Sequence, residues 1–191
     1  LIAVLSAFAI LSCTDSKFDE QPQLPPIEED GGKGEIPVSG YDEPYRPLIH
    51  YTPAKNWVND PNGMVYVDGV YHLFYQYNPQ GNEWGNLSWG HATSTDLIKW
   101  KEQPVALTRD ELGDIFSGSA VYDKNNTAGF GTSTIVAIYT SSGQYQQQSL
   151  AYSTDGQTFT KYTQNPIIAN STEPDFRDPK VFWHEESQRW I

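Results

Sequence analysis

The chain has 191 residues, of which 14% are aromatic, 15 are glycine and 13 are proline, and its formal net charge is −12. The acidic balance and the lack of a basic patch argue against nucleic acid or an anionic ligand as a partner, and a neutral ligand fits better. One cysteine excludes an intrachain disulfide, and the four histidines lack metal-ligand spacing, so we predict neither a metal nor another cofactor.

The first thirteen residues have the pattern of a secretory signal. Residues 1–12 are almost all apolar, too few to span a bilayer, which needs about 20, but suited to the apolar core of a signal peptide. Ile10-Leu11-Ser12-Cys13 resembles the lipobox of bacterial lipoproteins. We therefore expect residues 1–13 to be a signal peptide, truncated at its start, with lipidation at Cys13. The lipid would anchor the protein to the bacterial cell envelope, at the outer-membrane surface or in the periplasm, without crossing the membrane. The alternative is a buried core strand with an incidental cysteine.

Residues 14–47 have the composition of a linker. They contain six prolines and carry nine acidic and three basic side chains, which is half of the net charge of the chain. Such a segment buries little apolar surface, so we predict an extended or disordered tether.

Residues 48–191 alternate short apolar and aromatic runs with turns and show no sustained helical periodicity, which predicts an all-β domain. An internal repeat sets its architecture. Ser-Thr-Asp occurs at 94–96 and again at 153–155, about 60 residues later, each time after an apolar run. A period of this length with several strands per unit is typical of propeller blades, and we predict the first two to three blades of a β-propeller.

The segment 57–63 opens the first unit and carries the first candidate site residue. Asp60 precedes Pro61, which biases it toward extended geometry. Asn62-Gly63 predicts a turn, and residues 64–67 predict a strand. Taken alone, these residues describe an ordinary turn with a solvated aspartate.

The repeat changes that interpretation. Asp178-Pro179 opens a later unit as Asp60-Pro61 opens the first, with residues 116–119 at the corresponding place between them. The innermost strands of propeller blades surround one channel, so we expect the two carboxylates to face a shared cleft. The alternative is two unrelated turns on the rim.

Aromatic and amide residues accompany the two aspartates, namely Trp57, Trp84, Trp89, Phe116, Asn59 and Gln76. Aromatic faces pack on the C–H surfaces of sugars, and amides and carboxylates pair with hydroxyls that would otherwise be buried without partners. Two carboxyl groups are also what glycoside hydrolysis requires. The pattern therefore predicts a carbohydrate site.

Here the chain resembles glycoside hydrolase family 32, the β-fructosidases (invertases, inulinases and levanases). The family block W-x-N-D-P-N-G stands at Trp57–Gly63, with Val58 where the family usually has methionine. Further blocks follow in family order at 74–79, 84–86, 89–91, 116–119 and 176–179. The resemblance covers about residues 49–191.

The resemblance implies a retaining enzyme that cleaves β-fructofuranosyl linkages in levan, inulin or sucrose, on a five-bladed β-propeller followed by a β-sandwich that this chain lacks. It implies that Asp60 is the nucleophile and that Asp178, beside Arg177, binds ring hydroxyls and stabilises the transition state. It implies a fructose subsite formed by Asn59, Gln76, Trp84, Phe116 and Ser117.

The acid/base of the family is a glutamate in a Glu-Cys block, and no such pair occurs here. We expect it beyond residue 191 and do not assign Glu173, whose neighbours suggest a polar loop. Losing general acid catalysis lowers a rate by roughly 10²–10⁴-fold, so we expect the 191-residue piece alone to be inactive, and aggregation-prone through open sheet edges.

Two alternatives stay open. One is a non-catalytic fructan-binding surface lipoprotein, and the other is a five-bladed glycosidase for arabinose- or xylose-based glycans. Nothing in the sequence predicts an oligomeric state.

Overall fold

The structure is a computed structural model that describes residues 41, 43–47 and 49–191, all within the unit Val38–Ile191. The predicted signal peptide with Cys13, and most of the predicted linker 14–47, lie outside the described residues. The described end of that linker contacts the domain, because the Tyr41 hydroxyl donates a hydrogen bond of 2.7 Å to Oε2 of Glu102. Burial and this neighbouring carboxylate raise the pKa of Tyr41 to about 12.

Ten strands and no helix make up the described residues, so the all-β prediction is confirmed. The strands are β1 (Val58–Val67), β2 (Val70–Tyr77), β3 (Ser88–Ser94), β4 (Trp100–Leu107), β5 (Asp114–Asp123), β6 (Thr134–Ser142), β7 (Gln146–Ser153), β8 (Thr160–Lys161), β9 (Trp183–His184) and β10 (Arg189–Trp190).

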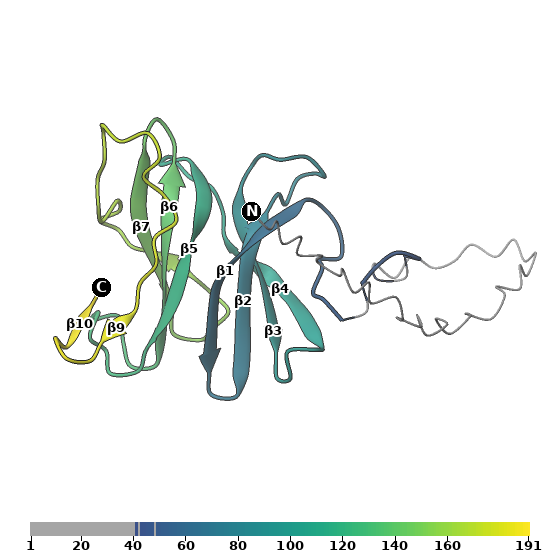
Figure 1. Ribbon diagram of the computed structural model, residues 1–191, viewed down its shortest axis with the longest axis horizontal. Coiled ribbons are helices and arrows are strands. Elements are labelled where there is room, and N and C mark those ends of the chain that lie inside the picture. The colour runs from purple at the N-terminus through teal and green to yellow at the C-terminus, as the bar shows by residue number, and fades with distance from the viewer. Residues whose placement is uncertain (1–40, 42, 48) are drawn as a thin grey trace, which may run out of the picture. The chain divides into compact units, whose positions relative to one another are not determined.

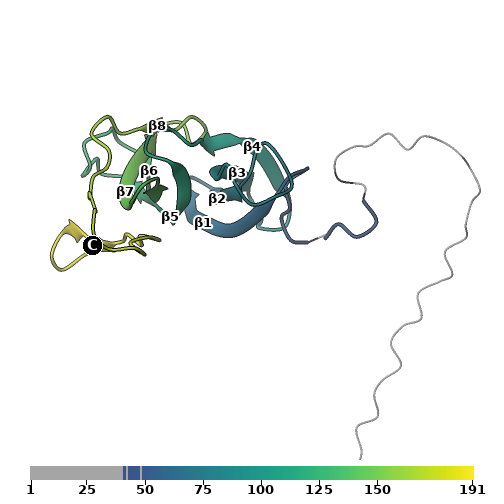
Figure 2. The same ribbon diagram turned by 90° about the horizontal axis from the view of Figure 1, so that it is seen from above.

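Eight of the strands form two four-stranded sheets in which every strand pairs antiparallel with its neighbour in sequence, and β9 and β10 form a separate two-stranded sheet. The order is β1-β2-β3-β4 in the first sheet and β5-β6-β7-β8 in the second, so each predicted repeat unit is one sheet (Figure 1). Strands β1 and β5 lie side by side where the two sheets meet, which is visible in both views (Figures 1 and 2). The opening strands of the two repeats are therefore neighbours.

One hydrophobic core joins the two sheets. Phe74 and Trp89 of the first sheet and Ile115 and Tyr139 of the second are fully buried in the same cluster. The rings of Trp89 and Tyr139 meet edge-on across the interface, with centroids 6.1 Å apart. Burial of each such side chain contributes roughly 1.5–3 kcal/mol, so the two sheets stabilise each other.

The Ser-Thr-Asp repeat marks the same turn in both sheets. Oδ1 of Asp96 accepts hydrogen bonds from the backbone N–H groups of Ile98 and Lys99. Oδ1 of Asp155 does the same for Gln157 and Thr158. These N–H donors lower the pKa of Asp155 to about 2. The repeated aspartate therefore closes the connection to the last strand of each sheet.

The turn predicted at Asn62-Gly63 is wrong. Strand β1 runs without a break from Val58 to Val67, and its register against β2 is irregular at two places. Gly63 does adopt a turn-like φ of 48°, but as part of the second irregularity. A β-bulge uses the same backbone conformations as a turn while keeping the strand direction, which is why the local pattern misled.

The third unit is only partly strand-like. Of residues 180–183, which follow Asp178-Pro179, only Trp183 pairs in a regular strand, in the hairpin of β9 with β10. Asp178-Pro179 precedes it outside any strand, so the second candidate aspartate does not lie on a sheet.

Candidate active site

Asp60 lies in the first bulge of β1. Val58 pairs with Tyr77 and Pro61 pairs with Tyr75, so three steps along β1 oppose two along β2. Pro61 has no N–H to give to the ladder, which suits it to such an irregular position. Bulges re-aim side chains, and the Asp60 carboxylate is exposed at this one.

A corresponding bulge in β5 presents Ser117. Ile115 pairs with Ser141 and Gly118 pairs with Tyr139, again three steps against two. The Ser117 hydroxyl donates a hydrogen bond of 2.9 Å to Oδ2 of Asp60. Two irregularities at the same place in adjacent repeats thus bring together residues that are 57 positions apart.

Two buried side chains of the first sheet hold the β5 bulge. Nε2 of Gln76 donates to the carbonyl of Ile115, and Nε1 of Trp89 donates to the carbonyl of Phe116, both at 3.0 Å. Gln76 is 3% exposed and Trp89 is fully buried. The expectation that Trp89 flanks a sugar pocket is therefore wrong, because its ring packs in the core and its N–H positions the backbone next to Ser117.

A cleft of about 630 Å³ opens above the two bulges, and both candidate carboxylate residues line it. The lining comes from β1, β5 and the segment before β9, and consists of Asp60, Pro61, Asn62, Gly63, Met64, Ser117, Gly118, Ser119, Ala120, Asp178, Pro179 and Lys180. Aspartates that are more than a hundred positions apart in the sequence therefore share one cavity.

Asp178 has an unusual backbone conformation, with a φ of 63°. Non-glycine residues seldom adopt this left-handed region, and aspartate is one of the few that do so with some frequency. Nε of Arg177 lies 3.8 Å from Oδ2 of Asp178, but the guanidinium also pairs with Asp175, which is the main cause of a raised pKa of Arg177.

The other residues predicted to form the subsite lie outside the lining of the cleft. Asn59 is exposed next to Asp60, Phe116 is half-buried in the β5 bulge, and Trp84 is 63% exposed in the connection between β2 and β3. These three, with Gln76 and Arg177, are not among the residues that line the cleft.

Asn62 is a cleft residue that sequence reasoning assigned to a turn. Its side chain is 3% exposed, and its Oδ1 accepts a hydrogen bond of 3.2 Å from the N–H of Gly118 on β5. Within the described part of the chain its buried Nδ2 has no hydrogen-bond partner. Asn62 therefore links β1 to β5 beside the cleft. The only signal in the sequence was its place in the motif, which turn chemistry explained equally well.

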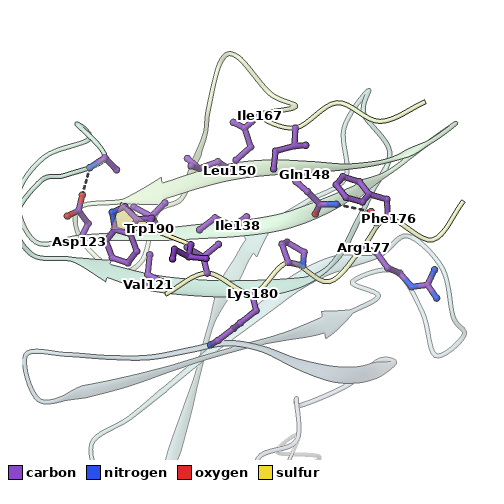
Figure 3. Close-up of a pocket in the computed structure, with 16 residues that line it drawn as sticks. Val121, Asp123, Ile138, Gln148, Leu150, Ile167, Phe176, Arg177, Lys180 and Trp190 are labelled. Carbon is purple, nitrogen blue, oxygen red and sulfur yellow. Dashed lines mark hydrogen bonds between the residues drawn. The ribbon is translucent and has the colours of Figure 1, made fainter. Parts of the chain in front are cut away.

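A second cavity of about 460 Å³ lies on the outer face of the second sheet, against the segment 176–191 (Figure 3). Its walls are largely aliphatic and aromatic, including Ile138, Leu150 and Phe176. Asp123 is its one carboxylate, and that group accepts hydrogen bonds from Thr127 and Ala128. The Arg177 side chain points away from this cavity (Figure 3). The cleft lined by two exposed aspartates is therefore the better candidate for chemistry.

No three His, Cys, Asp or Glu side chains of the described residues gather closely enough to hold a metal ion. The same residues include no helix long and apolar enough to cross a membrane.

Comparison with known proteins gives a consistent result. The family model described as "Glycosyl hydrolases family 32 N-terminal domain" matches residues 50–191. A levanase of Bacillus subtilis is 60% identical over 158 residues, which are 80% of this chain and 23% of that protein. An extracellular exo-inulinase of Aspergillus niger is 53% identical and covers 79% of this chain and 34% of its own length. The chain thus spans about a quarter to a third of these relatives.

Among solved structures, a fructofuranosidase of Schwanniomyces occidentalis complexed with fructose matches with a TM-score of 0.73 and 49% identity, over 82% of this chain and 32% of that one. The matched structures are five-bladed β-propellers, and the two sheets β1–β4 and β5–β8 correspond to blades. The fold prediction of two to three blades of such a propeller is confirmed.

Proposed function

Because the chain belongs to glycoside hydrolase family 32, we propose that it forms part of the catalytic domain of a retaining β-fructofuranosidase that acts on fructans or sucrose. The observation that carries this proposal is the shared cleft, in which Asp60 comes from the first repeat, Asp178 from the third, and Ser117 of the second donates a hydrogen bond to Asp60. A neutral sugar also suits an acidic chain that would repel anions.

In the proposed reaction Asp60 is the nucleophile. One of its carboxylate oxygens forms a bond to the anomeric carbon of the fructosyl unit while the bond from that carbon to the leaving oxygen breaks. The leaving oxygen takes a proton from a general acid, which we assign to no residue of this chain. Water then attacks the anomeric carbon, gives its proton to the conjugate base of that acid, and breaks the fructosyl ester, which regenerates the Asp60 carboxylate. Oδ2 of Asp60 is engaged with Ser117, which leaves Oδ1 as the attacking atom.

Asp178 acts on the sugar rather than on the bond that breaks. Its carboxylate accepts hydrogen bonds from ring hydroxyls, and these bonds strengthen as positive charge develops on the ring in the transition state. Nε of Arg177 lies 3.8 Å from Oδ2 of that carboxylate. In this proposal Asn59, Trp84 and Phe116 complete the fructose subsite, and the buried Gln76 supports it through the carbonyl of Ile115.

The relatives support the substrate class. They include proteins named as levanase, exo-inulinase and invertase, which share the β-fructofuranosyl unit and differ in the linkage. The fructofuranosidase of Schwanniomyces occidentalis is complexed with fructose. The common chemistry among these proteins is recognition of a terminal or internal fructosyl group.

The test uses the complete gene product and measures the sugar released from levan, inulin and sucrose. Arabinan and xylan are assayed in parallel as alternative substrates. We expect release from at least one fructosyl substrate. Asp60→Ala should abolish release while fructan binding by calorimetry is retained. Release only from arabinose or xylose glycans would favour the other five-bladed glycosidase. Tight fructan binding by a wild-type protein that releases no sugar would favour the non-catalytic binding lipoprotein.

We further propose that Cys13 is lipidated and that the protein is held at the bacterial cell envelope. The support is the apolar run 1–12 directly before Cys13 and the polar, proline-rich segment that follows. Mass spectrometry of the N-terminal peptide should find a diacylglycerol-modified cysteine, and Cys13→Ala should move the protein from the membrane fraction to the soluble one. An unmodified cysteine in membrane-associated protein would contradict the proposal.

A further inference from the structure

The segment that carries Asp178 is held in place without a sheet. Residues 176–181 belong to no strand, yet Asp178 is fixed in the left-handed region with a φ of 63°. This conformation is energetically unfavourable for a non-glycine residue and persists only where the surrounding structure imposes it. The contacts that impose it come from side chains rather than from backbone pairing.

Two buried side chains of the second sheet contact the backbone on either side of Arg177. Nε2 of Gln148, on β7, donates a hydrogen bond of 2.8 Å to the carbonyl of Phe176 (Figure 3). Oγ1 of Thr140, on β6, accepts a hydrogen bond of 3.1 Å from the N–H of Asp178. Thr140 and Gln148 face each other across the β6–β7 ladder, and the Thr140 hydroxyl donates to Oε1 of Gln148 at 2.9 Å.

Each polar group of the Thr140–Gln148 pair has a defined role as donor or acceptor. The Thr140 hydroxyl has one proton, which it gives to Gln148, so its lone pair is free for the N–H of Asp178. The Gln148 amide accepts at its oxygen and donates at its nitrogen. Thr140 is fully buried and Gln148 is 3% exposed, so the hydrogen bond between them is shielded from water. A neutral, closed network of this kind sets one geometry for the Asp178 backbone.

A third side chain fixes the other end of the segment. The Ser119 hydroxyl, on β5, donates to the carbonyl of Pro179 at 2.9 Å and accepts from the N–H of Val181 at 3.0 Å. Ser119 lies two residues after Ser117 on the strand that contacts Asp60. The two carboxylates are thus placed relative to each other through β5.

We propose that Thr140 and Gln148 are positioning residues that hold the Asp178 carboxylate in the cleft and do not themselves contact the sugar. The proposal rests on the proposed fructosidase function and adds to it the groups on which Asp178 depends. It also gives these buried polar residues a role that packing alone does not require, since an apolar pair of the same shape would fill the same space in the sheet.

The test replaces Thr140 by valine, which has the same shape and no hydroxyl, in the complete gene product. We expect kcat/KM for fructosyl substrates to fall about 10-fold to 100-fold, because the N–H of Asp178 loses its hydrogen-bond partner and the Asp178 backbone is released. The fall should be mainly in kcat, since Asp178 acts most strongly in the transition state. Thr140→Ser restores the hydroxyl and should recover activity to within about threefold of wild type.

The matched control is Ser141→Ala. Ser141 is the next residue on β6, is equally buried, and shares a hydrogen bond of 2.8 Å with Ser149 on β7. Among the described residues, its side chain forms no hydrogen bond to the segment 176–181. It should lose stability but keep kcat/KM. A loss of activity equal to that of T140V would mean that any buried hydroxyl of these strands has the same effect, which would contradict the proposal.

A double-mutant cycle separates positioning from general damage. In an Asp178→Ala background, T140V should lower kcat/KM by less than about twofold further, because the group that it positions is gone. An equally large fall in both backgrounds would overturn the proposal. If T140V does not fold, Gln148→Met carries the same test from the other side of the network.

Failure of the proposed function has a different signature. A wild-type protein that releases no fructose contradicts the function, and the positioning is then judged from the crystal structure of T140V. Asp178 should leave the left-handed region in that variant. An unchanged Asp178 φ with the carboxylate still in the cleft would overturn the positioning whatever the activity.

Discussion

Two Asp-Pro segments supply the carboxylates of the cleft, and they are held in different ways. Asp60-Pro61 lies inside β1 and pairs with β2 through the backbone on both sides of its bulge. Asp178-Pro179 lies outside any strand, and buried side chains of the neighbouring sheet bind its backbone. The same dipeptide thus reaches the same cavity by two kinds of support.

The difference shows which interactions control each carboxylate. A strand with a bulge has many backbone hydrogen bonds, so no single side chain decides where Asp60 points, although Ser117 selects its rotamer. The Asp178 segment depends on a few side-chain contacts, each of which a substitution removes. We therefore expect function at Asp178 to be sensitive to residues that never contact substrate, and function at Asp60 to be sensitive mainly to its immediate neighbours.

The largest effect among the tests of this comparison is expected for Asp178→Asn. The asparagine side chain has the same shape as aspartate, and the backbone N–H that donates to Thr140 is unchanged. The substitution removes only the negative charge that stabilises the transition state. Contacts of this kind supply several kcal/mol, so kcat/KM should fall about 10²–10³-fold in fructose-release assays. The melting temperature should stay within about 2 °C of wild type. A fall in kcat/KM that comes with a large drop in melting temperature would point to a structural role instead.

A smaller effect is expected for Ser117→Ala, which removes the hydroxyl that binds Asp60. Hydrogen bonds to charged groups contribute roughly 1.5–3 kcal/mol, so kcat/KM should fall about 10-fold to 100-fold. Ser117→Thr keeps the hydroxyl and serves as the control. Unchanged steady-state kinetics in S117A would show that the bulge of β1 alone orients Asp60.

The backbone support of the first segment is tested by Gly63→Ala with Gly69→Ala as control. Both glycines have positive φ, but a Cβ at Gly63 would stand 3.0 Å from both Ala120 and Phe74, whereas a Cβ at Gly69 meets nothing within 4 Å. We expect G69A to destabilise by about 1–2 kcal/mol, and G63A by about 1–3 kcal/mol more, in urea unfolding of the complete gene product. Equal losses would mean that β1 is not tightly packed on β5.

The smallest expected effect is the pH dependence of stability, which we assign to a histidine pair of the first sheet. Nδ1 of His72 lies 3.1 Å from Nε2 of His91 in the middle of the first sheet. The pKa of His91 is lowered to about 3, mainly by burial and to a lesser extent by repulsion from His72. The folded state therefore takes up fewer protons than the unfolded state between pH 6.5 and about 3. Stability is fully present above pH 6.5 and falls as the pH decreases through this window.

We expect the free energy of unfolding to decrease by about 1 kcal/mol between pH 7 and pH 6, measured by urea unfolding at each pH. His91→Gln should flatten this slope even if it lowers the absolute stability. The Thr140–Gln148 network carries no titrating group, so T140V should leave the slope as in wild type. A slope that H91Q does not change would show that other groups govern the acid sensitivity.

Much of the fold followed from the sequence because the signals were local and repeated. Alternating apolar runs predicted strands, and the recurrence of Ser-Thr-Asp predicted equivalent units, which the structure explains as the same aspartate-closed turn at Asp96 and Asp155. The order of motifs along the chain also predicted the family. These features depend on neighbouring residues, so the chain carries them before it folds.

The errors arose where a residue acts on a distant one. Asn62-Gly63 has turn chemistry, yet the packing of β1 on β5 makes it a bulge, with Asn62 bonded to Gly118. Trp89 is a residue type that often stacks on sugars, yet its ring lies in the core and its N–H donates a hydrogen bond to the carbonyl of Phe116. Local patterns do not distinguish a ring that stacks on a ligand from one that supports a backbone.

The amino-acid sequence by itself determined the strands, the repeat and the identity of the two acidic residues, because periodicity and backbone preference act over a few neighbours. Only the tertiary structure decided that Asp60 and Asp178 share a cleft, and that Ser117, Thr140 and Gln148 orient them. These contacts join residues tens of positions apart, and their energies depend on burial and direction, which exist only once the two sheets have packed together.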